Sequence, residues 1–237
     1  MPVDGTNVPY AKWCTTNITY NNANILDDTL PTGFNESTMI SKYKGFYIAR
    51  YEASFDYNGG NIRARSKKSL NKTTSNWLTT RNATYDGYLW NFINYTDAKT
   101  YSENMANKYG YDEAKVSTNL ITGTQWDTAM RWINNSGKSV TNSITWGNYF
   151  NSESPANVFG YGSLQISGYT SYWKAKNVYD LAGNTYEFTN EKYSSNVIVR
   201  GGIYEHNGVN VPASYRYSRN VTSEYYYVSF RITIYIK

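Results

Sequence analysis

The chain has one cysteine and one histidine among its 237 residues, Cys14 and His206. A single cysteine excludes an intramolecular disulfide and any metal site built from several thiolates. A single histidine likewise excludes a metal centre on which two or three imidazoles converge. The fold must therefore be stabilised by packing, and two frequent kinds of metal site are ruled out.

Long hydrophobic runs are also missing. No stretch approaches the roughly 20 apolar residues that a membrane-spanning helix needs. The start, M-P-V-D-G-T-N-V-P, lacks the basic and apolar regions of a signal peptide. We therefore expect no membrane span and no signal peptide, so that a place on a virion or cell surface would require another component as the anchor.

The excess of one charge sign is small. The net charge is +5, from 23 basic and 18 acidic residues. The densest basic stretch, R-A-R-S-K-K-S-L-N-K from Arg63 to Lys72, could form a nucleic-acid surface, but a solvated loop is the favoured interpretation. None of the usual nucleic-acid-binding modules is visible, and we expect no nucleic-acid partner.

Aromatic residues, by contrast, are abundant. The chain has 26 tyrosines and seven tryptophans, and its hydrophobic content of 40% is typical of a folded globular protein. Residues 1–44 are rich in Asn, Thr and Pro and are expected to form a loop-rich lead-in packed on the domain. Residues 45–237 show no internal repeat or linker, which favours a single domain.

Two helices are predicted in the middle of the chain. The first has Thr96 as a plausible N-cap and Gly110 as its stop. The second has the capping-box spacing, with Thr122 and Gln125 able to satisfy each other's backbone amides. Its apolar stripe predicts a face packed in the core and consists of Trp126, Ala129, Met130 and Ile133.

Strand patterns flank these helices. K-G-F-Y-I-A-R-Y-E-A-S from Lys44 to Ser54 is predicted to be a strand, and Gly59-Gly60 a turn. From Val228 to Lys237 apolar and polar residues alternate strictly, which is the period of one half-buried strand.

Four stretches, in order along the chain, resemble the formylglycine-generating-enzyme branch of the C-type lectin fold. They are Gly45 to Ala53, Phe92 to Ala106, Leu120 to Asp127, and Asn177 to Thr189 followed by R-G-G at Arg200 and S-F-R at Ser229. The family's usual motifs differ at several positions, where this chain has Gly123-Thr124, Tyr186, Phe188 and Ser229. The resemblance implies an α+β fold with two main helices packed on small, mostly antiparallel sheets, and with long loops.

The same resemblance has implications for chemistry. Members that oxidise a substrate cysteine use a cysteine pair, and related sulfoxide synthases hold iron through several histidines; this chain has one of each residue. We therefore expect a protein that is not an enzyme and has no cofactor. Relatives bind calcium near the block from Asp180 to Glu187, and oxygens of Asn184 and Glu187 would suit a hard cation. The favoured alternative is that Asn184 holds a tight turn and Glu187 bonds backbone amides, so calcium is not assigned.

The segment from Arg200 to Lys237 looks like the variable region of a protein diversified by a retroelement. Such systems rewrite adenines, so that asparagine codons scatter into Tyr, Ser, His, Asp, Val, Ile and others. The positions here that such a codon can reach, and that we expect to bind ligand, are Ile203, Tyr204, His206, Val209, Val211, Tyr215, Tyr217, Ser218, Asn220, Tyr225, Tyr226 and Tyr227. Glu205 and Glu224 cannot be reached and are expected to be fixed or differently encoded, while Arg200, Gly201, Gly202, Phe230 and Arg231 are expected to hold the scaffold.

Residue chemistry independently favours binding by this segment. Tyrosine offers a large amphipathic area at low rotamer cost, although tyrosine-rich strands can also simply pack. The hypothesis is a non-catalytic protein of a phage, prophage or microbial cell that displays this surface to a protein or cell-surface ligand. The alternatives are an active or degenerate oxidase of the formylglycine-generating type and a structural virion or surface component. The oligomeric state is left open.

Overall fold

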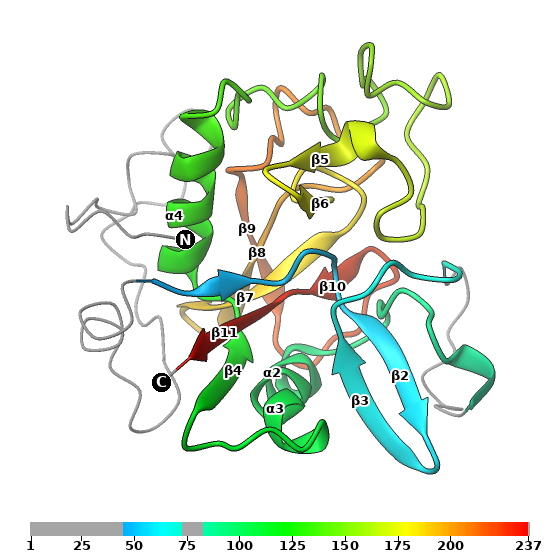
Figure 1. The fold of residues 1–237 in the computed structure, drawn as a ribbon. Coiled ribbons are helices and arrows are strands. Elements are labelled where there is room, and N and C mark those ends of the chain that lie inside the picture. Colours follow the sequence, from blue (N-terminus) through cyan, green and yellow to red (C-terminus); the bar gives the residue numbers. More distant parts are fainter. Residues whose placement is uncertain (1–44, 73–82, 237) are drawn as a thin grey trace.

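The computed structural model describes residues 45–72 and 83–236. The expected lead-in, residues 1–44, and Cys14 lie outside the described residues. Within the described ranges the chain combines three α-helices with strands arranged in four small sheets (Figure 1). None of these helices has the length and apolar character required to cross a membrane. The expected α+β class, with helices packed on small and mostly antiparallel sheets, is confirmed.

A three-stranded antiparallel sheet joins the two ends of the described chain. Its order is β1-β11-β4, comprising β1 (Tyr47–Ile48), β11 (Ile232–Ile236) and β4 (Val116–Leu120). In Figure 1 the blue strand β1 lies beside β11. The register of the pair places Tyr47 opposite Ile234. The observed strand β1 is thus much shorter than the strand predicted from Lys44 to Ser54. Backbone amides in the later part of that stretch donate to partners outside the sheet; the amide of Glu52, for example, donates to the hydroxyl of Ser167.

A four-stranded sheet forms the centre of the molecule. Its order is β10-β7-β8-β9, comprising β10 (Val228–Phe230), β7 (Tyr186–Tyr193), β8 (Asn196–Arg200) and β9 (Arg216–Asn220). The pairs β7–β8 and β8–β9 are antiparallel, whereas β10 runs parallel to β7. The sheet therefore places the start and the middle of the C-terminal segment, on β8 and β9, side by side, and β10 on the other side of β7.

The prediction of one half-buried strand from Val228 onward is wrong. Arg231 separates β10 from β11, and the two strands belong to different sheets. Polar and apolar neighbours are both buried, as Ser229, Phe230 and Thr233 show. Alternation alone cannot reveal this, because a strand covered on both faces can keep alternating residue types when its polar side chains find partners inside the protein.

The first predicted helix is two helices. α2 (Tyr95–Glu103) begins two residues earlier than predicted, because the N-cap is Asn94, which accepts from the amide of Asp97 at 2.9 Å, and not Thr96. α3 (Met105–Lys108) follows after Asn104, and Gly110 then adopts a φ of 75°. The break has a visible cause, since the amide of Ala106 donates to the hydroxyl of Thr118 on β4 at 3.0 Å rather than continuing the helix.

The second predicted helix is confirmed as α4 (Gly123–Asn134). The capping box between Thr122 and Gln125 is formed in both directions. All four residues of the predicted stripe are fully buried, in a core cluster that also contains Trp146, Tyr149 and Leu181. A second cluster, built around Trp90, Phe188 and Phe230, fills the space between α2 and the central sheet.

The hairpin of β2 (Ser54–Asn58) and β3 (Asn61–Arg65) confirms the turn at Gly59-Gly60. It also corrects the interpretation of the basic stretch as a solvated loop. Arg63 and Arg65 lie on β3 and both form ion pairs with Asp56 across the hairpin, the second at 2.8 Å. The sequence pattern missed this because Asp56 lies outside the basic stretch and is brought opposite only by the turn.

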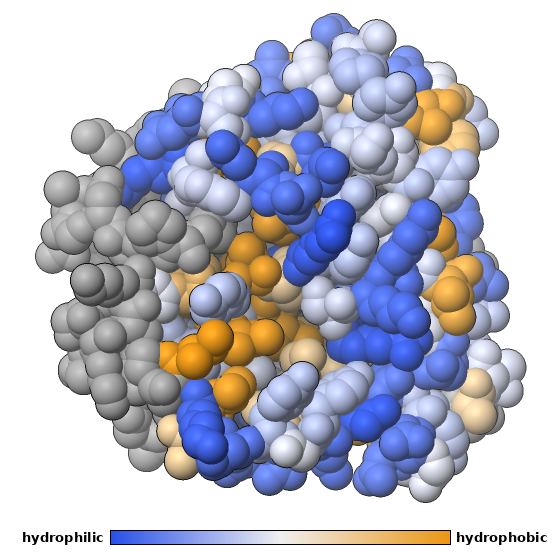
Figure 2. All heavy atoms as spheres, in the orientation of Figure 1, coloured by the Kyte–Doolittle hydropathy of each residue, from blue (hydrophilic) through white to orange (hydrophobic). Residues whose placement is uncertain are grey.

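The remaining elements are short. They are η4 (Ala83–Tyr85), η5 (Ser171–Trp173), β5 (Lys174–Ala175) and β6 (Val178–Tyr179). Long connections join them, in agreement with the expected long loops (Figure 1). On the face drawn in Figure 2, apolar residues gather near the middle and hydrophilic residues cover most of the surrounding surface.

Candidate ligand-binding surface

Three buried arginines hold the C-terminal segment on the central sheet. Arg200, at the end of β8, forms an ion pair with Asp127 of α4. Arg216, at the start of β9, pairs with Glu191, and Arg231 pairs with Glu187. Because both glutamates lie on β7, one strand binds the segment at two separate points.

The contacts of Arg231 explain why the chain can change sheets at this residue. Its guanidinium donates to Glu187 Oε2 at 2.8 Å, to the carbonyl of Ala49 at 2.9 Å and to the carbonyl of Tyr179 at 2.8 Å. A buried ion pair of this kind stabilises a site only when its remaining donors also find partners. Here the partners come from three segments distant in sequence, which locks them together.

The glycines after β8 are required by their backbone. Gly201 and Gly202 have φ values of 92° and 76°, which side-chain-bearing residues rarely adopt. A Cβ atom on Gly202 would also lie 2.6 Å from the carbonyl oxygen of Val211. The residues expected to hold the scaffold, which are Arg200, Gly201, Gly202, Phe230 and Arg231, are all buried.

Tyrosine rings gather around one further arginine, Arg219 on β9. Its guanidinium carbon lies 4.1 Å from the ring centroid of Tyr217, two residues earlier on the same face of the strand. It lies 5.6 Å from the ring of Tyr186 on β7, and 5.4 Å and 5.3 Å from those of Tyr225 and Tyr227, which come just before β10. Four rings from three parts of the chain thus surround one cation.

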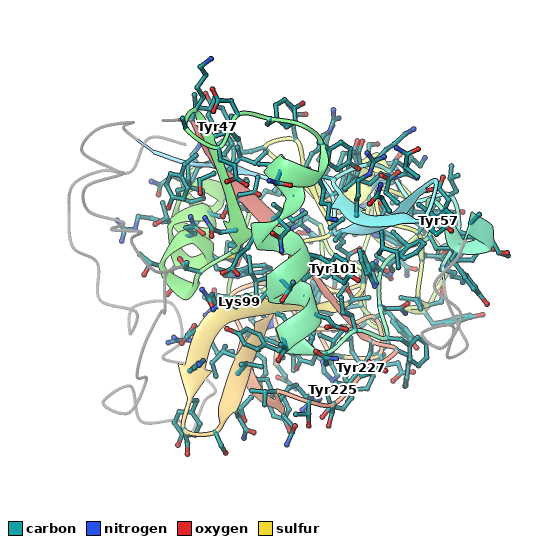
Figure 3. All side chains as sticks on the ribbon, turned by 90° about the horizontal axis from the view of Figure 1, so that it is seen from below. Tyr47, Tyr57, Lys99, Tyr101, Tyr225 and Tyr227 are labelled. Carbon is teal, nitrogen blue, oxygen red and sulfur yellow. The ribbon has the colours of Figure 1, made fainter. Side chains whose placement is uncertain are left out.

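More aromatic side chains extend this group. His206 contacts the edge of the Tyr186 ring, and Tyr215 stacks on Tyr217. Tyr226 packs against Tyr227 with their centroids 4.9 Å apart. Tyr225 and Tyr227, labelled in Figure 3, lie side by side. We call the set the tyrosine cluster, defined as Arg219 with Tyr186, His206, Tyr215, Tyr217, Tyr225, Tyr226 and Tyr227.

Most tyrosines proposed from the sequence therefore come together, and His206 joins them. Tyr204 adjoins the cluster, because its phenol interacts with the phenol of Tyr226. The same phenol also interacts with the carboxylate of Glu205. Val209 lies beyond them on the same loop and is well exposed, whereas Val211 is half-buried against the core.

Three proposed contact residues lie elsewhere. Ile203 is 4% exposed and belongs to the core cluster around Phe188, so its assignment to the ligand surface is corrected. Ser218 and Asn220 alternate with Tyr217 and Arg219 along β9, which directs them to the opposite face of the strand. The structure does not bring these two side chains to the tyrosine cluster.

Two members of the cluster were missed. Arg219 is not among the contact residues expected from the sequence, although its position two residues after Tyr217 in a strand indicates that both share a face. Tyr186 was noted only as a position where the chain departs from the family's motifs. The sequence around Tyr186 does not indicate a place in the cluster, because the strand order of the central sheet brings it to Tyr217 and Arg219.

The ionisable groups of the cluster favour a neutral or positive surface. Burial raises the pKa of Tyr186 and of Tyr227, so both phenols stay protonated and can donate hydrogen bonds. Burial lowers the pKa of His206, and the positive charge of Arg219 lowers it further against the opposing effect of Glu205. At neutral pH the ring of His206 is uncharged, and Arg219 carries the positive charge.

The residues considered for calcium are engaged by other groups. Asn184, whose φ is 63°, accepts from the amide of Gln165 at 3.0 Å and donates to Glu52 at 2.8 Å. It thus holds a turn, as the favoured alternative predicted, but Glu187 pairs with Arg231 rather than with backbone amides. In the part of the chain that the structure describes, no group of three or more His, Cys, Asp or Glu residues is placed to hold a metal ion.

Comparison with solved structures addresses the fold. PvdO from Pseudomonas aeruginosa is similar over 81% of each chain, with a TM-score of 0.50 and 14% sequence identity. The chain has the C-type lectin fold expected from its motifs. At this identity the likeness extends to the fold alone.

Two other solved structures are also similar. Treponema denticola variable protein 1 matches over 79% of this chain and 94% of its own, with a TM-score of 0.43 and 11% identity. CarF matches over 62% of this chain and 67% of its own, with a TM-score of 0.46 and 13% identity. TM-scores at this level carry no argument about function. No family model and no curated protein sequence matches the chain.

Proposed function

We propose that the chain is a non-catalytic ligand-binding protein whose tyrosine cluster recognises a protein or another surface ligand. The observation that carries the proposal is a set of tyrosine rings gathered around an arginine on a segment fixed by buried ion pairs. Tyrosine and arginine are the side chains that most often dominate the binding energy of protein interfaces. A rigid support keeps the ordering cost of binding low.

The exposure of the cluster supports the same function. Tyr226 is 37% exposed, and Val209, on the loop after β8, is 41% exposed. Rings that are partly buried by one another lose little rotamer freedom when a ligand covers them. The cluster can therefore supply anchors at its centre and adaptable contacts at its edge.

A non-catalytic role agrees with the chemistry of the described residues. His206, which would be the natural proton-transfer group, packs edge-to-face with Tyr186, and its pKa is lowered. Glu187 and Glu191 are tied to arginines of the scaffold. In the described ranges these groups serve packing and charge compensation.

We further propose that a retroelement diversifies this segment. The scaffold residues are all buried, whereas His206, Tyr217 and Tyr225 to Tyr227 are at least partly accessible. Sequencing of the neighbouring DNA tests this proposal. We expect a near-copy of the terminal segment, differing at adenines, beside a reverse transcriptase gene; a locus without both would contradict diversification but not binding.

Binding itself is tested on an array of purified microbial and host surface proteins. We expect the wild-type chain to capture at least one of them, and a double variant, Tyr226→Ala with Tyr217→Ala, to lose about tenfold or more in affinity. Tyr111→Ala is the matched control, because Tyr111 is 60% exposed and lies in the loop after α3. No capture by the wild type, or equal capture by the double variant, would overturn the proposal.

A further inference from the structure

Arg219 differs from the three arginines of the scaffold. Arg200, Arg216 and Arg231 are buried, and each pairs with a carboxylate. Arg219 is half-buried, yet no carboxylate of the described residues lies within ion-pair distance of it. Its Nε is buried without a hydrogen-bond partner, and its Nη1 reaches the carbonyl of the adjacent Ser218 at 3.3 Å.

The surrounding rings determine which part of the guanidinium is available. Tyr217 lies closest, at 4.1 Å from the guanidinium carbon, and Tyr186, Tyr225 and Tyr227 complete the surround. Aromatic contacts occupy the faces of a guanidinium, so its N–H donors, which lie in the plane, can still form hydrogen bonds. The guanidinium of Arg219 reaches the Ser218 carbonyl and interacts with the phenol of Tyr227, whereas its Nε has no partner. A planar carboxylate accepts two such N–H bonds at once, which makes it the best-matched partner.

The charges facing Arg219 favour the same partner. The phenols of Tyr186 and Tyr227 stay protonated, and His206 is neutral at neutral pH and cationic below its lowered pKa. Glu205 is exposed, and its carboxylate interacts with His206 and Tyr204 rather than with Arg219. A cation partly removed from water and without a compensating charge attracts an anion more strongly than a solvated lysine does.

We propose that Arg219 is the anchor of the tyrosine cluster and receives the carboxylate of an aspartate or glutamate from a protein ligand. This proposal rests on the proposed function and specifies the chemistry that the surface recognises. A protein ligand is favoured over an acidic glycan because the exposed ring of Tyr226, packed on Tyr227 beside Arg219, suits an apolar side chain next to the acid. The phenols of the cluster add donors to the second oxygen of the carboxylate.

A random-peptide phage library provides the probe. It is panned on the wild-type chain, on Arg219→Gln and on Lys115→Gln, a control that removes one positive charge at an exposed residue distant in sequence. We expect peptides recovered on the wild type and on Lys115→Gln to be enriched in Asp and Glu, and this enrichment to disappear on Arg219→Gln. Individual acidic peptides should bind Arg219→Gln at least about tenfold more weakly, and should also weaken as salt is raised.

Further variants keep the result decisive. Arg219→Lys retains the charge but not the planar fork, so we expect intermediate affinity for the same peptides. Should Arg219→Gln fail to fold, a competition experiment on the wild-type chain tests the same carboxylate site. We expect N-acetylaspartate amide to displace the selected peptides.

The outcomes separate the two proposals. Peptides that lose binding in Tyr226→Ala but carry no acidic preference would overturn the role of Arg219 and leave the binding function intact. Recovery of no peptide that depends on the cluster would count against both. Binding of alginate, a carboxylated glycan, without binding of any acidic peptide would overturn the assignment to a protein ligand.

Discussion

Neighbouring residues in the C-terminal segment serve opposite purposes, and burial distinguishes them. Ile203 packs among the side chains around Phe188, whereas Val209, six positions later, is 41% exposed. Both are aliphatic and both could arise from an asparagine codon. Their chemistry is therefore the same, and only their surroundings differ.

This contrast makes a prediction about stability. Ile203→Ala should lower the free energy of unfolding by about 2–5 kcal/mol, because it leaves a cavity in the core. Val209→Ala should change it by less than about 0.5 kcal/mol, because the side chain lies in solvent. Urea denaturation of the two variants measures the difference. Equal losses would show that Ile203 is not a core residue.

At the scale of elements, the passage from β10 to β11 decides the architecture of the C-terminus. Two strands of three and five residues belong to different sheets, and Arg231 lies at the boundary between them. Its ion pair with Glu187 and its bonds to two carbonyl groups satisfy polar atoms that would otherwise be buried without partners. The strand switch therefore depends on a single guanidinium.

We expect Arg231→Met to lower the free energy of unfolding by about 3–5 kcal/mol, because it leaves the carboxylate of Glu187 buried and uncompensated. Lys115→Met, at an exposed position, should have little effect. The double variant Arg231→Met with Glu187→Gln should recover part of the loss, since the uncompensated charge is then gone. A loss below about 1 kcal/mol in Arg231→Met would contradict this role.

At the scale of the whole molecule, buried carboxylates link stability to pH. Burial raises the pKa of Asp180 to about 7, and burial together with neighbouring carboxylates raises that of Glu52. Burial also raises the pKa of Glu187 against the opposing charge of Arg231. In the folded state Asp180 therefore holds a proton that the unfolded chain releases near pH 4, so its contribution to stability is complete below that pH and is lost as pH rises through about 7. The raised pKa values of Glu52 and Glu187 act in the same direction.

We accordingly expect the free energy of unfolding to be larger near pH 5 than near pH 8, with a slope of at most about 1.4 kcal/mol per pH unit for each such group. Asp180→Asn should flatten this dependence, whereas Glu153→Gln, at an exposed residue, should leave it unchanged. The lowered pKa of His206 acts in the opposite direction, and comparison with Asp180→Asn isolates the carboxylate effect. Urea denaturation at several pH values across this range measures the free energy of unfolding and hence the slope. Identical slopes for the wild type and Asp180→Asn would contradict the assignment.

The sequence by itself determined the features whose causes lie within a few residues. The capping box and buried stripe of α4 depend on spacings inside one helix, and the turn at Gly59-Gly60 on the freedom of glycine. The concentration of tyrosine in the C-terminal segment was equally visible, and most of the predicted tyrosines do meet. These features follow from local hydrogen bonding and from composition.

Only the tertiary structure decided how distant segments meet. Ile203 became a core residue, Ser218 and Asn220 faced away, and the strand from Val228 divided at Arg231 because of the sheets that neighbouring strands join. Tyr186 and Arg219 met because β7, β8 and β9 lie side by side and β10 returns parallel to β7. Strand order is fixed by packing between residues far apart in sequence, and no local period records it.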